Sequence, residues 1–163
     1  MLKLRHSYLL FLSGLLWMVV GCFLLPLGLN FIVEALLKKN ADNYYPVLHF
    51  LSPYVGGNES AALFWISVSL VLGIIKGRSV FAKSVQRSVV RIQALPNPAS
   101  ITKIYSPMYY LLLGSMFLLG FLFKFAPLDV RGGVDIAIGC ALIQGALLYF
   151  RQAWAARHRP ITL

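Results

Sequence analysis

Residues 7–29 read SYLLFLSGLLWMVVGCFLLPLGL, a run of 23 residues without a charged side chain. A helix needs about 20 mostly apolar residues to cross the hydrocarbon core of a bilayer, so this run is long enough to span one. It follows the basic segment MLKLRH, but it exceeds the roughly 7–15 apolar residues of a signal peptide, and no small-residue cleavage site follows it. We therefore expect a retained membrane helix over about residues 7–37.

Three further apolar blocks follow, at residues 60–75, 107–123 and 134–150, and Asp135 is the only charged residue in them. With their flanks they predict helices over about 60–95, 106–125 and 133–154. The chain is 59% hydrophobic and 12% charged, which is too apolar for a typical soluble domain. We expect residues 1–163 to form a single all-α integral membrane domain, a four-transmembrane-helix bundle.

Charge is distributed unevenly along the chain. With four spans and an inner N-terminus, the inner segments are 1–6, 76–105 and 151–163, and they hold eleven of the fifteen Lys and Arg residues. Because cytoplasmic loops are enriched in Lys and Arg, we predict that both termini are cytoplasmic. This placement explains the net charge of +10 without a nucleic-acid partner. The chain has no eukaryotic sorting signal, so we take a bacterial inner membrane as its expected location.

The predicted outer segment, residues 38–59, is rich in aromatic residues and contains Pro46 and Pro53. Aromatic rings settle at membrane–water interfaces, which explains this composition without a ligand. The sequence leaves three alternatives open, namely an interfacial helix, a re-entrant hairpin or a loop. The link at about 126–133, by contrast, is short enough to make its two helices antiparallel neighbours.

Residues 76–95, KGRSVFAKSVQRSVVRIQAL, extend the second predicted helix beyond the membrane as a basic amphipathic helix. At about 100° per residue, cations fall on one face and apolar residues on the other. The interpretation that we favour is that these cations anchor the helix to anionic headgroups of the membrane surface. The more specific alternative is a binding site for an anionic ligand or lipid headgroup. The candidate cations are Lys76, Lys83, Arg87, Arg91 and, from the fourth helix, Arg151.

Small residues recur at four-residue spacing in two of the predicted helices. Such residues let helix backbones approach closely in lipid. Aligning Ser69 and Gly73 with Ala141 and Gly145 suggests an internal duplication, a parallel 2+2 helix repeat about an axis along the membrane normal. The packing residues are Ser69, Gly73 and Gly77 in the second helix and Ala137, Ala141 and Gly145 in the fourth.

Few polar residues lie at predicted membrane depth, where they are costly and often functional. Asn30 and Glu34 follow Pro26 in the first helix, and Gln144 lies on the small-residue face of the fourth. Glu34 is the best candidate for handling a proton or cation. For Gln144 we prefer an interhelical hydrogen bond, and for the charges near residues 124–135 a set of interfacial ion pairs.

Enzyme activity has little support in this sequence. Cys22 and Cys140 lie in apolar blocks without a CxxC spacing, and the three histidines fall on opposite sides of the predicted membrane. Phosphate-binding, zinc-protease and serine-hydrolase motifs are missing. We expect no enzyme, no metal and no cofactor.

Two functions remain. A small transporter or channel, slightly favoured, would handle a small or anionic solute and predicts that Glu34, Gln144 and Lys76 face one hydrated cavity. The alternative is a noncatalytic lipid-binding, scaffold or assembly subunit of a membrane complex. The expected partners are the bilayer, with its anionic phospholipids, and another copy of the chain or a different membrane protein.

Overall fold

The protein is helical throughout most of the part that the computed structural model describes, which is residues 3–4, 6–38, 45–93, 99–100, 118 and 121–158. Two short strands pair antiparallel, with Lys3 opposite Ser100 and Leu4 opposite Ala99. The elements are β1 (Lys3–Leu4), α1 (His6–Leu37), α2 (Pro46–Val55), α3 (Asn58–Lys76), the π-helix η1 (Gly77–Phe81), α4 (Ala82–Gln93), β2 (Ala99–Ser100), the 3-10 helix η3 (Phe123–Phe125) and α6 (Leu128–His158).

Three of the described helices are long and apolar enough to cross a membrane. They comprise Ser7–Leu37, Asn58–Ser79 and Leu128–Ala155. At about 1.5 Å per residue each exceeds the roughly 30 Å of a hydrocarbon core. The predicted helix at 106–125 falls mostly outside the described residues, which include only Leu118 and the segment from Phe121 onward. The membrane class is therefore supported, and the fourth span stays a prediction.

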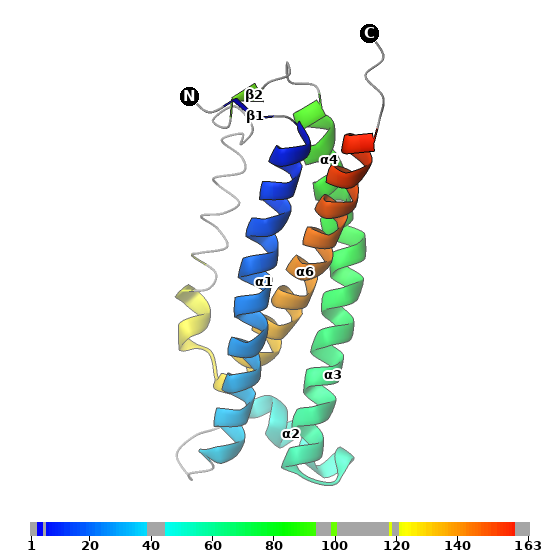
Figure 1. Ribbon diagram of the computed structural model, residues 1–163. Coiled ribbons are helices and arrows are strands. Elements are labelled where there is room, and N and C mark those ends of the chain that lie inside the picture. The colour runs from blue at the N-terminus through cyan, green and yellow to red at the C-terminus, as the bar shows by residue number, and fades with distance from the viewer. Residues whose placement is uncertain are drawn as a thin grey trace.

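The long helices stand side by side, with α6 packed against both α1 and α3 (Figure 1). One end of the bundle holds the start of α1, all of α4 and the last turns of α6, and we call it the α4 end. The opposite end holds α2, the last turn of α1 and the start of α6, and we call it the α2 end. Separate hydrophobic clusters fill the two ends, one around Leu10 and Leu142 and one around Ile32 and Ile136.

The helices α1 and α6 meet through glycines spaced seven residues apart. A Cβ added at Gly28 would lie 2.7 Å from the carbonyl oxygen of Gly132, and one at Gly21 would lie 2.8 Å from that of Gly139. Real side chains do not tolerate such distances, so the two backbones touch. Along this contact the residue numbers fall in α1 as they rise in α6, so the two helices run antiparallel. A seven-residue repeat of contacts is typical of a left-handed helix crossing.

The helices α3 and α6 run parallel and meet through the small residues spaced by four. A Cβ at Gly73 would lie 2.6 Å from the carbonyl oxygen of Ala137, and Gly77 lies against Ala141. This register contradicts the repeat alignment, which equates Gly73 with Gly145. A two-fold axis along the membrane normal would place equivalent residues at equal depth. Gly73, however, packs against Ala137, which lies eight residues, or about 12 Å along the helix, before Gly145.

Helix α2 is held at the α2 end by a buried carboxylate from α6. The side chain of Asp129 is 0% exposed, and its Oδ2 accepts hydrogen bonds from the backbone N–H groups of Val47 (2.7 Å) and Leu48 (3.2 Å). These are amides of the first turn of α2, which no residue within the helix can satisfy. Of the three alternatives for residues 38–59, the structure contains the short helix, at Pro46–Val55.

A tight turn joins α2 to α3, and a tryptophan of α3 contacts the start of α6. Gly56 (φ 84°) and Gly57 (φ 138°) join α2 to α3 in conformations that favour glycine. Trp65 of α3 lies over Gly133, and its indole N–H donates to the backbone carbonyl of Asp129 at 2.9 Å. Asp129 thus connects three helices, and it forms no ion pair with any described residue, in contrast to the interfacial ion pairs predicted for the charges near residues 124–135.

Candidate functional site

Helix α4 presents one buried and one exposed face at the α4 end. Val85 and Val89 are buried in the same cluster as Leu9 and Leu10 of α1. Lys83 and Arg87, one turn apart, are exposed. The helix therefore packs its apolar face on the bundle and leaves its cations outside, in the phase that the amphipathic pattern predicts.

Between α3 and α4 the π-helix η1 changes the predicted alignment of the cations. A single π turn acts like one residue inserted into an α-helix, so it rotates α4 by about 100° relative to α3. Lys76, which lies before this turn and is exposed, leaves the stripe formed by Lys83 and Arg87. The expectation of one continuous stripe that includes Lys76 is wrong, because it assumed uniform α geometry.

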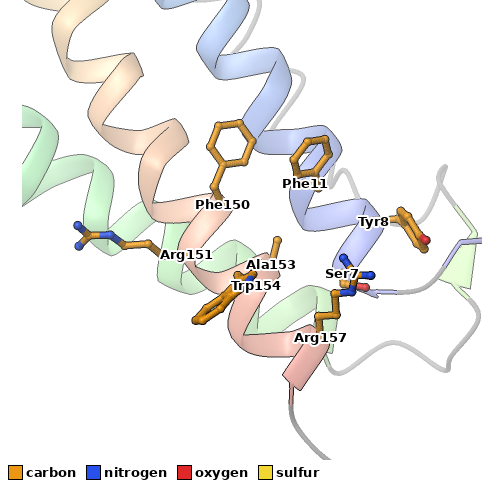
Figure 2. A pocket seen from close by; sticks show the side chains of 8 residues that line it. All are labelled: Ser7, Tyr8, Phe11, Phe150, Arg151, Ala153, Trp154 and Arg157. Carbon is orange, nitrogen blue, oxygen red and sulfur yellow. The ribbon is translucent and has the colours of Figure 1, made fainter.

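The two remaining candidate cations, Arg91 and Arg151, belong to different helices. The backbone of Arg91 belongs to α4, and its side chain lies outside the described part of the structure. Arg151 is exposed on α6, and its side chain is directed away from α1 (Figure 2). The described residues therefore do not gather the predicted cations into one pocket; they distribute them over α3, α4 and α6.

A pocket of about 710 Å³ lies between the first turns of α1 and the last turns of α6. At its deeper side the rings of Phe11 and Phe150 face each other, with centroids 5.2 Å apart. At its outer side the guanidinium of Arg157 reaches from α6 toward Ser7 of α1 (Figure 2). The described lining residues are Ser7, Tyr8, Phe11, Phe150, Arg151, Ala153, Trp154 and Arg157.

The α1–α6 register explains why these residues meet. Continuing the seven-residue spacing from the Gly21–Gly139 contact brings Ser7 opposite Ala153, and both line the pocket. Gly14 provides the space for the ring of Phe150, because a Cβ there would lie 2.8 Å from its Cε1. This site was not predicted from the sequence, since the lining residues lie at the two ends of the chain. The shared seven-residue spacing of Gly14, Gly21 and Gly28 with Gly132 and Gly139 was the available signal.

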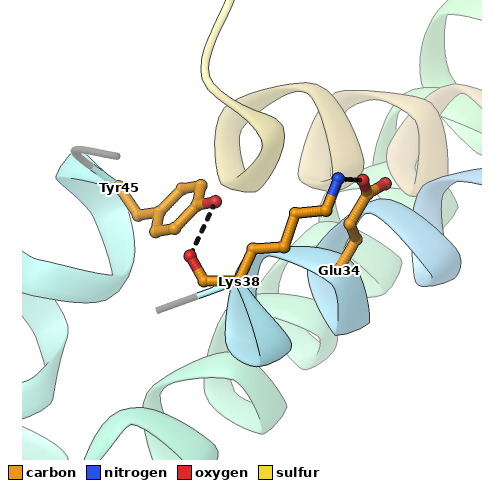
Figure 3. A network of polar contacts seen from close by, with 3 residues as sticks. All are labelled: Glu34, Lys38 and Tyr45. Atoms are coloured by element: carbon orange, nitrogen blue, oxygen red, sulfur yellow. Dashed lines mark hydrogen bonds and ion pairs between the residues drawn. The ribbon is translucent and has the colours of Figure 1, made fainter. Parts of the chain in front are cut away.

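The structure places the predicted intramembrane polar residues at different positions on the described helices. Asn30 is exposed on α1, and Gln144 packs against Gly77 at the α3–α6 contact. Glu34 lies in the last turns of α1, where its carboxylate forms an ion pair with Lys38 (Figure 3). Glu34 lies near the α2 end, whereas Lys76 directly precedes Gly77, which packs against Ala141 near the middle of α6.

The ion pair at the end of α1 accounts for the local electrostatics of Lys38. The hydrogen bond and the charge of Glu34 raise the pKa of the Lys38 ammonium above its ordinary value. The Tyr45 hydroxyl donates to the backbone carbonyl of Lys38 at 3.5 Å, which connects the end of α1 to the start of α2 (Figure 3). Glu34 is thus engaged in an ion pair with Lys38 at this end of α1.

Charge separates the two ends of the bundle. In the described part, Glu34, Glu59, Asp129 and Asp135 all belong to the α2 end. There Arg131 also places its guanidinium 4.2 Å from the centre of the Phe31 ring. The exposed cations of the α4 end in the described part are Lys83, Arg87, Arg151 and Arg157, whereas Lys76 and Arg78 flank Gly77, which packs near the middle of α6.

No His, Cys, Asp or Glu cluster among the described residues could hold a metal ion, and the described cysteines Cys22 and Cys140 are free. Comparisons of the chain with protein-family models, with curated proteins and with solved structures found no match. A function is therefore inferred from the α4 end itself.

Proposed function

We propose that this chain is a noncatalytic membrane subunit whose α4 end binds anionic phospholipid at the cytoplasmic face of a bacterial inner membrane. The observation that carries the proposal is the division of α4, with Val85 and Val89 buried against the bundle and Lys83 and Arg87 exposed. A cationic side chain near an anionic membrane surface gains about 1 kcal/mol. The cations of the α4 end therefore orient the chain and select anionic lipids around it.

The orientation and the fourth span belong to the same proposal. Ser100 lies at the α4 end, whereas α6 begins at the α2 end, and the apolar block at 107–123 lies between them in the sequence. A fourth span there returns the chain across the membrane and keeps both termini on the cation-rich side, which the positive-inside rule favours.

The transporter alternative is less well supported. It requires Glu34, Gln144 and Lys76 to face one hydrated cavity, and the described residues do not bring these three together. At the α1–α6 contact the backbones approach too closely to leave a path. We therefore prefer the lipid-binding function, with scaffolding or assembly of a membrane complex as its biological context.

Electron spin resonance with spin-labelled lipids tests the proposal. The full chain is reconstituted in phosphatidylcholine containing a trace of labelled phosphatidylglycerol or labelled phosphatidylcholine, and the motionally restricted fraction of each is measured. We expect the wild-type chain to prefer phosphatidylglycerol and the double reversal K83E/R87E to reduce that preference severalfold. The charge-conserving pair K83R/R87K is the matched control. An unchanged preference in K83E/R87E would refute the proposal.

A further inference from the structure

The pocket between α1 and α6 has the polarity gradient of a phospholipid. Arg157 and Ser7 lie at the outermost turns of their helices, and the Phe11–Phe150 pair lies one to two turns deeper. A lipid in the adjacent leaflet carries its phosphate and its acyl chains in the same order. The pocket volume of about 710 Å³ is in the range of roughly 300–1,000 Å³ found for small-molecule sites.

The polar groups of the pocket favour a phosphodiester with net negative charge. An arginine guanidinium forms paired, charge-assisted hydrogen bonds with phosphate oxygens, and the hydroxyls of Ser7 and Tyr8 can donate as well. None of the described lining residues is acidic, so the ammonium group of a zwitterionic lipid would find no counter-charge there. This distinguishes phosphatidylglycerol chemistry from phosphatidylethanolamine chemistry.

The apolar floor suits an acyl chain. Phe11 is 52% exposed, although it stands beside Phe150, which indicates a ring surface that a chain can cover. Phe150 is fixed from behind by Gly14, where an added Cβ would lie 2.8 Å from its Cε1 and 3.0 Å from the Cβ of Tyr149. Packing against Gly14 therefore holds the Phe150 ring in place, and a group fixed before binding loses less entropy on binding than a mobile one.

We propose that this pocket binds one net-anionic glycerophospholipid, with its phosphodiester on Arg157 and an acyl chain along Phe11 and Phe150. The inference rests on the proposed function for the orientation of the α4 end. The site itself is separate from α4, because no described residue of α4 lines it. The lipid held here is a single, slowly exchanging molecule, whereas α4 selects rapidly exchanging lipids around the protein.

Native mass spectrometry of the full chain tests the proposal. The chain is released from nanodiscs that contain equal amounts of palmitoyl-oleoyl phosphatidylglycerol and palmitoyl-oleoyl phosphatidylcholine, and the retained lipid is identified by its mass. We expect one phosphatidylglycerol per chain. We expect R157Q to reduce this retention about tenfold, the loss typical of one charge-assisted contact. R78Q is the matched control, because Arg78 is an exposed arginine of η1 that does not line the pocket.

Two further measurements define the ligand. F150A keeps Arg157 but removes the floor, so it should weaken retention of the two-chain lipid, with an unchanged circular dichroism spectrum as evidence of folding. Soluble glycerol phosphate at millimolar concentration should not displace the lipid; displacement would overturn the proposal in favour of a headgroup-only site.

Equal retention of both lipids, or equal losses in R157Q and R78Q, would also overturn it. These failures differ from that of the proposed function, since K83E/R87E tests lipid preference in the spin-label experiment while leaving the pocket intact.

Discussion

Removing the carboxylate of Asp129 should release α2 from the bundle. The variant D129A deprives the backbone N–H groups of Val47 and Leu48 of an acceptor now 2.7 and 3.2 Å away. A hydrogen bond to a charged group contributes about 1.5–3 kcal/mol, and truncation of an N-terminal cap costs about 0.5–2 kcal/mol. Since the second bond is long, we expect a total of about 3 kcal/mol for local opening of α2.

Hydrogen exchange followed by mass spectrometry measures this opening directly. A loss of about 3 kcal/mol corresponds to a roughly hundredfold faster exchange of the α2 amides, with little change in α1. D129N keeps one acceptor and should lose about 1 kcal/mol. The control is E59A, because Glu59 is an exposed acid at the start of α3. Unaltered α2 exchange in D129A, or the same acceleration in E59A, would show that the carboxylate does not hold this helix.

Three other predictions concern individual contacts, two between helices and one at the end of α1. G21A places a Cβ 2.8 Å from the carbonyl oxygen of Gly139 and should destabilise the packing of α1 against α6 by about 1–3 kcal/mol, measured by thermal unfolding in detergent. The control C22A, at an exposed neighbouring residue, should leave the stability unchanged. Equal destabilisation by the two variants would contradict the close contact between α1 and α6. W65F removes the indole N–H that donates to the Asp129 carbonyl and should cost about 1 kcal/mol, whereas a melting temperature unchanged from wild type would contradict that bond. Because Glu34 raises the pKa of Lys38, the stabilisation from their pair is complete at neutral pH and is lost as pH rises through the raised folded pKa; an NMR titration should place the Lys38 midpoint above that of Lys38 in E34Q, and identical midpoints would refute the coupling.

The membrane class could be predicted from the sequence because uncharged apolar runs of this length are typical of transmembrane helices and rare in soluble domains. The sequence also identified small residues that pack together, such as Gly73 and Ala137, since close backbone approach needs small side chains. It did not predict the partner of Asp129, because Val47 lies 82 residues away, and periodicity carries no information about such pairs. The expectation that Asp129 forms an ion pair came from charge proximity in the sequence alone.

The π turn and the pocket between α1 and α6 could not be predicted from the hydrophobic periodicity of single helices. The π turn at Gly77–Phe81 leaves no mark in the hydrophobic periodicity, so Lys76 was placed on the wrong face. The pocket depends on the register of α1 against α6, and the spacing of Gly14, Gly21 and Gly28 would have predicted it only together with that of Gly132 and Gly139.

The position of α6 between α1 and α3 also has a consequence for biosynthesis. Both glycine contacts described above lie on α6, which leaves the ribosome after the other two helices. Until α6 is inserted, the surfaces of α1 and α3 that pack against it are exposed to lipid. These surfaces can then pair prematurely with neighbouring chains. The packing of α1 and α3 is therefore completed by a helix that is synthesised after both, and a chain that stops before Leu128 would leave these two helices in the membrane without their shared partner.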